Sequence, residues 1–537
     1  MDLLDFSVVL LCLMTGSCKS QPQQFWNDMA QNDMRKAMKF QPNTNVAKNV
    51  ILFIGDGMSI STITAARIRR GQLQGRTGEE TVLKFEEFPH VGLLKTYPVD
   101  RQTADSASTA TALLSGVKTK YYLVGLDATA KRGDCASAKG ARLKTMVDWA
   151  EEEGKSTGIV TTTRLTHATP SSAYAHSVDR DWEGDVNMDD KTGKCRDVAH
   201  QFVFENRNIE VAFGGGRRHF IPYDVADPEA NFTYAKYQRR DNRNLIDCWK
   251  FLQDEDGKRF KYVWNKQQFD DIDPDNVDNV LGLFAPSHMQ YEMERDDGPQ
   301  GEPSLTEMTT KAIKILQKND KGFFLMVEGG RIDHAHHDNK AKKALHETLA
   351  LEDAVREAVR LTDEEDTMIV VTADHSHVFS LGGYPSRGND ILGTQPTIYI
   401  STAVDDVPEQ YLPPDRKGFT TITYGNGPGF EGGNRTDPRY IDTTTDDYVF
   451  PSAVPLGQDT HGADDVAVYA RGPMSHLIHG VHEQNYVAHV MAYASCIGIN
   501  KAHCAHYRVI NTGPIHTPHS GLLLVVIACI LLLNIRL

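Results

Sequence analysis

Three segments that lie far apart in the chain each place an acidic side chain at the end of a short apolar run. Asp56, Glu328 and Asp374 are these residues, and the runs before them are 50–54, 323–327 and 368–371. Apolar runs of this length that end in Gly or a charge are typical of buried parallel strands. Ligands bind just beyond the carboxyl ends of such strands. We therefore expect these carboxylates to converge on one metal-dependent site.

Histidines near the same runs add nitrogen ligands. In the segment Asp-His-Ala-His-His over 333–337, a helix would put Asp333 and His337 four residues apart on one face, the usual geometry for two ligands of one metal. His375 and His461, near other predicted strands, are further candidates. A His-rich stretch alone is more often a solvated surface, and a lone His is more often a loop or capping residue. The carboxylates at neighbouring strand ends favour a metal centre.

Ser106 is the candidate nucleophile. Small residues around it lead into a predicted helix, and a helix start favours an anion because its backbone N–H groups are free. A Ser there is usually only a cap. No Ser-His-Asp arrangement is evident, so a bound metal ion would have to ionise the hydroxyl. Arg180 could clamp phosphate oxygens bidentately, and Thr169 offers a hydroxyl to a hard cation. These residue types indicate metal-dependent phosphoryl transfer.

Strand-like runs alternate with helical stretches along the chain. Helices are predicted over 143–153, 305–318 and 340–361, and further strands over 156–161, 210–213 and 463–470. The alternation predicts an α/β fold, a three-layer α/β/α sandwich around a central, mainly parallel sheet. Two segments break the alternation and are interpreted as insertions into one catalytic domain over 21–511: a subdomain over 223–302 and a loop-rich region over 382–456.

Both ends of the chain are typical of processing signals. A short apolar core followed by small residues predicts a signal peptide over 1–20. Near the other end an apolar segment of about 13 residues is shorter than the roughly 20 needed to span a bilayer. It follows small residues and a polar spacer, which predicts glycosylphosphatidylinositol (GPI) attachment at Asn511 and removal of 512–537. A tail anchor or a buried terminal helix is the alternative. The expected location is the extracellular face of the cell membrane.

A secreted chain tends to pair its cysteines, and five of the eight remain once both signals are removed. Cys496 and Cys504 close a short loop, and Cys135 with Cys195 is the next candidate pair. Cys248 is then a free thiol or an intermolecular partner.

Glycosylation and charge complete the sequence-level predictions. Sequons begin at Asn231 and Asn434, and they are meaningful because the chain is predicted to be secreted. The formal net charge is −15 with no compensating basic stretch, which argues against nucleic acid as a partner.

These segments together strongly resemble the eukaryotic, membrane-anchored alkaline phosphatases. The resemblance runs from Phe25 to about Cys504, and its motifs are 49–58, 105–111, 161–180, 322–337, 372–387 and 464–473. It implies an enzyme that hydrolyses a broad range of phosphate monoesters with an alkaline optimum. It also implies a homodimer and likens the second insertion to the family's crown-like region. The amphipathic stretch 26–40 is interpreted either as a contact with the partner or as a segment that packs on its own domain.

The resemblance implies two zinc ions and one magnesium ion. One zinc would bind Asp333, His337 and His461, the second would bind Asp56, Ser106, Asp374 and His375, and magnesium would bind Asp56, Thr169 and Glu328. This division agrees with ligand chemistry, since imidazoles go to zinc and an all-oxygen set goes to magnesium. By the same resemblance Ser106 forms a phosphoserine intermediate, Arg180 clamps the phosphate, and His167 and His377 support the centre.

A calcium site in the first insertion is implied in the same way. Its ligands would be Glu229, the carbonyl of Phe284, and Glu302. Ala285 departs from the family, which usually has a calcium-binding Glu at that position, so the site lacks one ligand.

The residues argue against two other classes of function: another enzyme on the same scaffold, either a sulfatase or a phosphodiesterase, and a surface protein without catalysis. A sulfatase needs a formylglycine motif that Ser106 lacks. A phosphodiesterase commonly uses Thr as nucleophile and lacks the Arg180 clamp and the third metal site. A catalytically idle, lipid-anchored surface protein would have no reason to keep every metal ligand and the nucleophile. The residues therefore favour the monoesterase.

Overall fold

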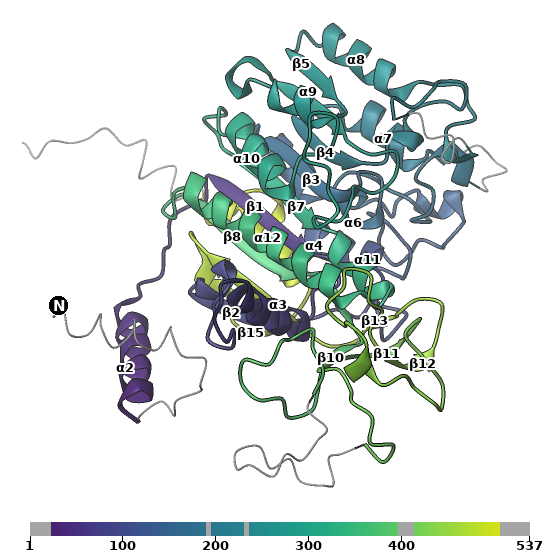
Figure 1. Ribbon diagram of the computed structural model, residues 1–537. Helices are drawn as coiled ribbons and strands as arrows, with labels where there is room; N and C mark the ends of the chain where they lie inside the picture. Colours follow the sequence, from purple (N-terminus) through teal and green to yellow (C-terminus); the bar gives the residue numbers. More distant parts are fainter. Residues whose placement is uncertain (1–22, 189–194, 230–235, 396–412, 505–537) are drawn as a thin grey trace, which may run out of the picture.

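The computed structural model describes residues 23–188, 195–229, 236–395 and 413–504 (Figure 1). The predicted signal peptide, the sequon residue Asn231 and the GPI candidate Asn511 lie outside these residues. In the part of the chain that is described, no helix is both long enough and apolar enough to cross a bilayer.

Helices and strands alternate from one end of the description to the other. The helices are α2 (Gln23–Lys39), α3 (Ile60–Leu73), α4 (Ser106–Ser115), α5 (Met146–Glu152), α6 (Ala168–Ser171), α7 (Val198–Glu205), α8 (Leu245–Glu255), α9 (Lys266–Asp270), α10 (Leu305–Leu316), α11 (Arg331–His337), α12 (Ala341–Leu361) and α13 (Tyr486–Ser495). The strands are β1 (Asn49–Gly55), β2 (His90–Lys95), β3 (Ser156–Arg164), β4 (Val211–Gly215), β5 (Phe260–Val263), β6 (Asn279–Leu283), β7 (Phe323–Gly329), β8 (Thr367–Ala373), β9 (Ser376–His377), β10 (Phe379–Leu381), β11 (Ile422–Gly427), β12 (Ser452–Pro455), β13 (His461–Gly462), β14 (Val466–Arg471) and β15 (Gly480–Glu483).

One large sheet forms the centre of the molecule. Within the described residues it has ten strands in the order β15-β2-β14-β8-β1-β7-β3-β4-β6-β5. β14 runs antiparallel to both of its neighbours, and the other neighbouring pairs are parallel. Every residue of β1, β7 and β8 is buried, as expected for parallel strands covered on both faces.

Helices cover both faces of this sheet. α12 contacts both α3 and α10 on the face turned toward the viewer in Figure 1. α13 contacts α4 and α5, and both α5 and α13 pack on central strands of the sheet. The predicted three-layer α/β/α architecture with a mainly parallel sheet is therefore confirmed. It is stabilised by one extensive apolar core that includes Val50–Ile54 and Phe323–Val327.

The two predicted insertions make different additions to this framework. The segment 223–302 supplies β5 and β6, which extend the central sheet at one edge. The segment 382–456 supplies β11, which pairs with β10 and β12 in a separate three-stranded sheet. Beside it, β9 and β13 form a two-stranded ribbon that pairs His377 with His461. This ribbon brings the last predicted metal ligand back to the strand ends.

Two disulfides fix the loops around the sheet. Cys135 is bonded to Cys195 and Cys496 to Cys504, as predicted. The first bond borders a small second core of apolar side chains that includes Leu123 and Trp182. Cys248 is a free, half-buried thiol on α8.

The N-terminal helix α2 stands apart from the rest of the molecule in Figure 1. None of its residues is buried, and even its large apolar side chains are exposed: Trp26 is 48 % exposed and Met38 is 75 % exposed. A helix that presents large apolar side chains to solvent lacks a packing surface within the described chain.

Candidate metal centre

The carboxyl ends of three adjacent strands bring the predicted carboxylates together. Asp56 follows β1, Glu328 lies near the end of β7, and Asp374 follows β8. In the sheet Glu328 is the register partner of Ile54, two residues before Asp56. All three carboxylates are fully buried. Because buried carboxylates without partners are costly, this arrangement indicates a cation-binding centre.

The first group of candidate ligands comes from α11 and the β9–β13 ribbon. His337 Nε2 lies 3.3 Å from Asp333 Oδ2, and His461 Nε2 lies 3.4 Å from Asp333 Oδ1. The two imidazole Nε2 atoms are 3.3 Å apart. α11 is helical as expected, so Asp333 and His337 do share one face.

Backbone carbonyls set the tautomers of these histidines. His337 Nδ1 donates to the carbonyl of Asp459 at 2.6 Å, and His461 Nδ1 donates to the carbonyl of Ala104 at 2.7 Å. A neutral imidazole that donates through Nδ1 keeps its lone pair on Nε2. Both lone pairs therefore point into the centre, as they do in metal-ligating histidines.

The second group surrounds the hydroxyl of Ser106. His375 Nε2 lies 3.1 Å from Ser106 Oγ and 3.3 Å from one oxygen each of Asp56 and Asp374. His375 Nδ1 faces the carbonyl of Ser376 at 3.3 Å, which again leaves Nε2 as the lone-pair nitrogen. One imidazole, two carboxylates and one hydroxyl thus meet around a single point.

The third group contains only oxygen. Glu328 Oε2 accepts hydrogen bonds from Thr161 and, at 3.1 Å, from Thr163. Its other oxygen, Oε1, and both oxygens of Asp56 are buried without a hydrogen-bond partner among the described residues. Thr169 Oγ1 is buried beside them. Hard oxygen donors with free lone pairs fit magnesium.

Burial and the close approach of several carboxyl groups shift the pKa values of the residues in this centre. Burial raises the pKa of Glu328 to about 7 and that of Asp374 to about 6. Burial, then the charges of Asp374 and Asp333, raises the pKa of Asp56 well above its ordinary value. Burial also lowers the pKa of His337 to about 4, which keeps its imidazole neutral and able to bind a metal. Bound cations would stabilise every one of these groups in its ligating form.

The hydroxyl of Ser106 lies at the start of α4, as predicted. The cap of that helix is Asp105, whose side chain accepts from Ser108 N, so Ser106 is free for another role. Arg180 approaches the same point: its Nη1 lies 3.2 Å from Asp105 Oδ2, and its backbone N–H donates to Tyr122 O. The candidate nucleophile Ser106, the start of α4 and the Arg180 guanidinium therefore lie close together, as an anion-binding position requires.

Two further predicted residues support these groups from outside. His377 lies between two carboxylates, with Nε2 2.6 Å from Asp333 and Nδ1 2.9 Å from Asp459. His167 Nε2 lies 3.3 Å from Arg180 Nη2. Sequence reasoning missed Asp105 and Asp459, although each stands within two residues of a predicted site residue, Ser106 and His461.

The predicted calcium ligands lie in one region of the first insertion. Glu302 is buried, and its Oε2 accepts from Gln290 N at 2.8 Å. Burial, with a contribution from the charge of Glu229, raises the pKa of Glu302 to about 7. Glu229 itself is exposed and forms an ion pair with Arg217 at 2.6 Å. The two carboxylates are therefore near each other, but one already has a cationic partner.

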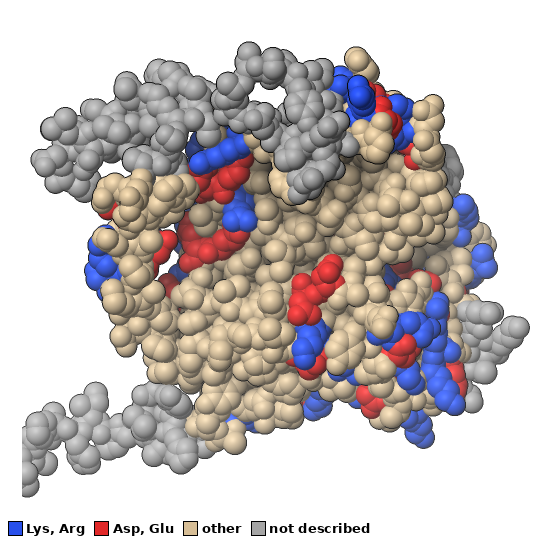
Figure 2. Space-filling model, turned by 90° about the horizontal axis from the view of Figure 1, so that it is seen from below, with Lys and Arg blue, Asp and Glu red and all other residues tan. Residues whose placement is uncertain are grey.

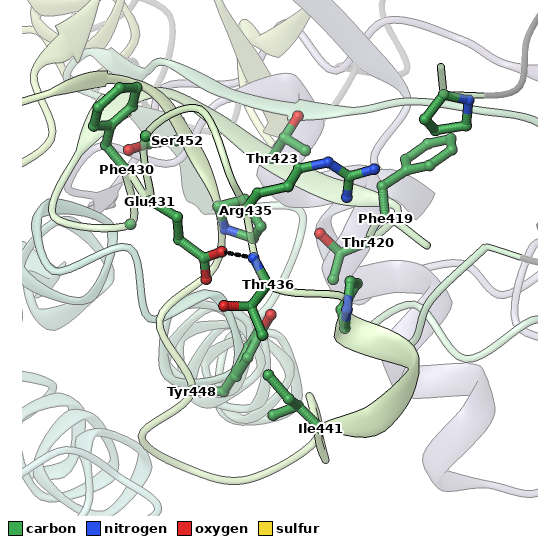
Figure 3. A pocket seen from close by; sticks show the side chains of 15 residues that line it. Phe419, Thr420, Thr423, Phe430, Glu431, Arg435, Thr436, Ile441, Tyr448 and Ser452 are labelled. Carbon is green, nitrogen blue, oxygen red and sulfur yellow. Dashed lines mark hydrogen bonds between the residues drawn. The ribbon is translucent and has the colours of Figure 1, made fainter. Parts of the chain in front are cut away.

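A pocket of about 450 Å³ lies in the second insertion, away from these residues (Figure 3). Phe419, Phe430, Ile441 and Tyr448 contribute apolar surface to it, and Glu431 accepts from the backbone N–H of Thr436 at its side. None of the predicted catalytic or metal-binding residues lines this pocket.

Comparison with known proteins agrees with the geometry. The family model for alkaline phosphatase matches residues 47–497. The tissue-nonspecific alkaline phosphatase of the cat, Felis catus, is 49 % identical over 509 residues, which are 92 % of this chain and 94 % of that protein. An alkaline phosphatase of Gadus morhua is 47 % identical over 494 residues, which cover 90 % of this chain and all of that protein. The solved structure of alkaline phosphatase from the Antarctic bacterium TAB5 covers 84 % of this chain and 99 % of its own, with a TM-score of 0.57 and 23 % identity, and supports the fold.

Proposed function

Since the chain belongs to the alkaline phosphatase family and is a phosphate monoester hydrolase, we propose that it works through two zinc ions, one magnesium ion and a phosphoserine formed on Ser106. The first zinc is held by Asp333, His337 and His461, the second by Asp56, Ser106, Asp374 and His375, and magnesium by Asp56, Thr169 and Glu328. The convergence of the buried, unpartnered oxygens of Asp56 and Glu328 with three imidazole lone pairs carries this proposal.

In this mechanism Ser106 Oγ attacks the phosphorus in line with the leaving oxygen. Arg180 holds two equatorial oxygens and balances their charge, and the free N–H groups at the start of α4 face the same anion. Water then attacks the phosphoserine from the opposite side, and inorganic phosphate leaves. The bound metals supply Lewis acidity, which favours the ionised hydroxyl and the departing oxygen. An alkaline optimum is expected, because ionised oxygen nucleophiles are needed in both steps.

The test compares an aryl phosphate monoester with the matching diester from neutral to alkaline pH, in a secreted chain truncated near residue 511. Strong monoester turnover that chelation abolishes and zinc with magnesium restores supports the proposal. Preference for the diester would make phosphodiester hydrolysis the main activity of the chain. No turnover by a folded, metal-loaded protein refutes the mechanism.

We also propose that the enzyme is a homodimer. The apolar side chains of α2 have no packing partner within the described chain. In addition, the middle of the face in Figure 2 carries few charged side chains, as is typical of protein contacts. A chain that lacks residues 1–40 should sediment as a monomer, whereas an unchanged mass would remove this role of α2.

The remaining proposals concern location and calcium. The GPI anchor at Asn511 and glycans at Asn231 and Asn434 rest on sequence pattern. Release of activity from intact cells by a phosphatidylinositol-specific phospholipase tests the anchor. Calcium bound by Glu229, Glu302 and the Phe284 carbonyl is supported by the raised pKa of Glu302, and a calcium-dependent rise of the thermal midpoint tests it.

A further inference from the structure

Three histidines outside the proposed zinc groups gather beside the centre. One ring nitrogen each of His167, His288 and His334 lies within 4.8 Å of the others. All three side chains are partly exposed, so solvent reaches them. His288 comes from the loop after β6, His334 from α11, and His167 from the turn before α6. Distance alone would suit a transition metal.

The hydrogen-bond partners of these rings point to a different ligand. Each ring accepts from an arginine: His167 Nε2 from Arg180 Nη2 at 3.3 Å, His334 Nδ1 from Arg331 Nη1 at 3.0 Å, and His288 Nε2 from Arg164 Nη1. A guanidinium can only donate, so the lone pair of a neutral ring is on the nitrogen that faces the arginine. In His167 and His334 the other nitrogen then carries hydrogen, and protonation would only add a second N–H. His288 differs, because its Nδ1 also faces a donor, the backbone N–H of Arg164 at 3.3 Å, so this ring offers no free N–H to a ligand.

This polarity is the reverse of that in the zinc groups. There His337 and His461 donate to backbone carbonyls and turn a lone pair toward the centre. A metal at the three-histidine cluster would have to reverse the tautomers of His167 and His334 and displace the arginines that donate to them. These two rings instead offer N–H groups, and His167 Nδ1 is buried without a hydrogen-bond partner among the described residues.

Charge favours an anion at the same place. Arg164 is paired with Glu183 at 2.6 Å, and Arg180 with Asp105 at 3.2 Å. In the described part of the chain Arg331 forms no ion pair; it lies over the Tyr291 ring at 3.8 Å, and its Nε has no hydrogen-bond partner. Its charge interacts only at longer range with the buried carboxyl groups of Glu347 and Glu302, so positive charge is available beside the cluster.

We propose that Arg331, His334 and His167 form a subsite for a second tetrahedral oxyanion, next to the phosphate held by Arg180, with the His288 ring packed against that of His334. The ligand is a phosphate group, either a second phosphoryl group of the substrate or free inorganic phosphate. The position of the first phosphate rests on the function proposed above. The subsite adjoins it because a ring nitrogen of His167 lies within 4.8 Å of oxygens of Asp56 and Glu328.

The test counts bound phosphate on the zinc- and magnesium-loaded Ser106→Ala chain, which cannot turn over. Equilibrium dialysis with labelled inorganic phosphate should give two phosphates per chain. Adding Arg331→Gln should weaken the second at least about tenfold, as expected for the loss of a charge-assisted hydrogen bond. Adding Arg360→Gln should not, because Arg360 is 63 % exposed and pairs only with its helix neighbour Glu357. His334→Gln provides a second probe if the Arg331 variant does not fold.

The proposal is overturned if Ser106→Ala without a subsite substitution binds only one phosphate per chain. It is also overturned if two phosphates still bind after each of the two subsite substitutions. Loss of one zinc per chain in His288→Gln also overturns it, because the cluster is then a metal site. Inorganic pyrophosphate separates the two sources: displacement of both phosphates by one pyrophosphate supports a linked second phosphoryl group, and retention of one supports free phosphate. The mechanism is tested separately, by turnover of an aryl phosphate in the chain that retains Ser106.

Discussion

Asp105 has two carboxylate oxygens with separate tasks, and one pair of substitutions should separate them. Oδ1 accepts from Ser108 N at 3.3 Å, from Ser108 Oγ at 2.8 Å and from Tyr122 N at 3.1 Å, so it caps the helix that carries the nucleophile. Oδ2 accepts from Arg180 Nη1 at 3.2 Å. In Asp105→Asn the amide oxygen can keep the cap, while its NH₂ group meets the guanidinium, donor against donor. Asp105→Ala removes both functions.

The expected magnitudes follow from these contacts. Loss of an N-cap costs about 1 kcal/mol of unfolding free energy, and the part-buried Tyr122 N–H left without an acceptor costs about 1–3 kcal/mol more. Asp105→Ala should therefore lose roughly 2–4 kcal/mol, whereas Asp105→Asn should stay near the parent because Asn caps as well as Asp. Phosphate affinity should fall in Asp105→Asn, although its stability does not. Without its partner, Arg180 regains side-chain entropy that phosphate binding must then remove, at a cost of about 1 kcal/mol.

That loss corresponds to about a fivefold rise in both KM for an aryl phosphate and the inhibition constant of inorganic phosphate in Asp105→Asn. kcat should not fall, since weaker product binding speeds phosphate release. Steady-state kinetics with phosphate as inhibitor and urea unfolding of both variants give the numbers. An unchanged phosphate constant in Asp105→Asn would show that Arg180 is held by something other than Oδ2, and equal destabilisation of the two variants would refute the capping assignment.

Three further predictions follow from the same geometry. Ser106→Ala should fold normally, since Asp105 is the cap, and should retain no acid-stable label after incubation with a radioactive monoester; retained label would exclude Ser106 as nucleophile. Metal-free enzyme should lose stability as pH rises from about 4 to 7, because the folded pKa values of Asp374, about 6, and Glu328, about 7, lie above the ordinary 3.8 and 4.5. The folded state then binds more protons than the unfolded state, and deprotonation destabilises it. Urea unfolding at pH 5 and pH 8 should show this difference and zinc with magnesium should abolish it, whereas a flat metal-free profile would contradict it. Replacing Cys135 and Cys195 by Ser should cost about 4 kcal/mol and replacing Cys496 and Cys504 about 2.5 kcal/mol, since the bonds span 60 and 8 residues; the reverse order in calorimetry would show that loop closure does not dominate.

The central framework could be predicted from sequence because its signals are local. Apolar runs before Asp56, Glu328 and Asp374 predict buried parallel strands, and adjacency of β8, β1 and β7 then follows from the rule that ligands gather at strand ends. Most of 223–302 is polar, so its composition predicts an inserted subdomain and not an extension of the sheet. The apolar run 280–285 within it, which contains most of β6, is nevertheless of the kind that predicts a buried strand. Pairing with β4 buries β6, and that contact is tertiary.

The roles of the histidines lie beyond the reach of sequence for a physical reason. His334 and His337 are three residues apart on one helix, and their side chains share one chemical type. In the proposed centre His337 can bind a metal because a carbonyl more than a hundred residues away, on Asp459, fixes its proton on Nδ1. His334 becomes a donor because Arg331, one turn earlier, occupies its Nδ1 lone pair. The direction of one hydrogen bond thus decides whether an imidazole attracts a cation or an anion. That direction depends on which partner the fold brings to each ring, so two neighbouring histidines can serve opposite charges within one active centre.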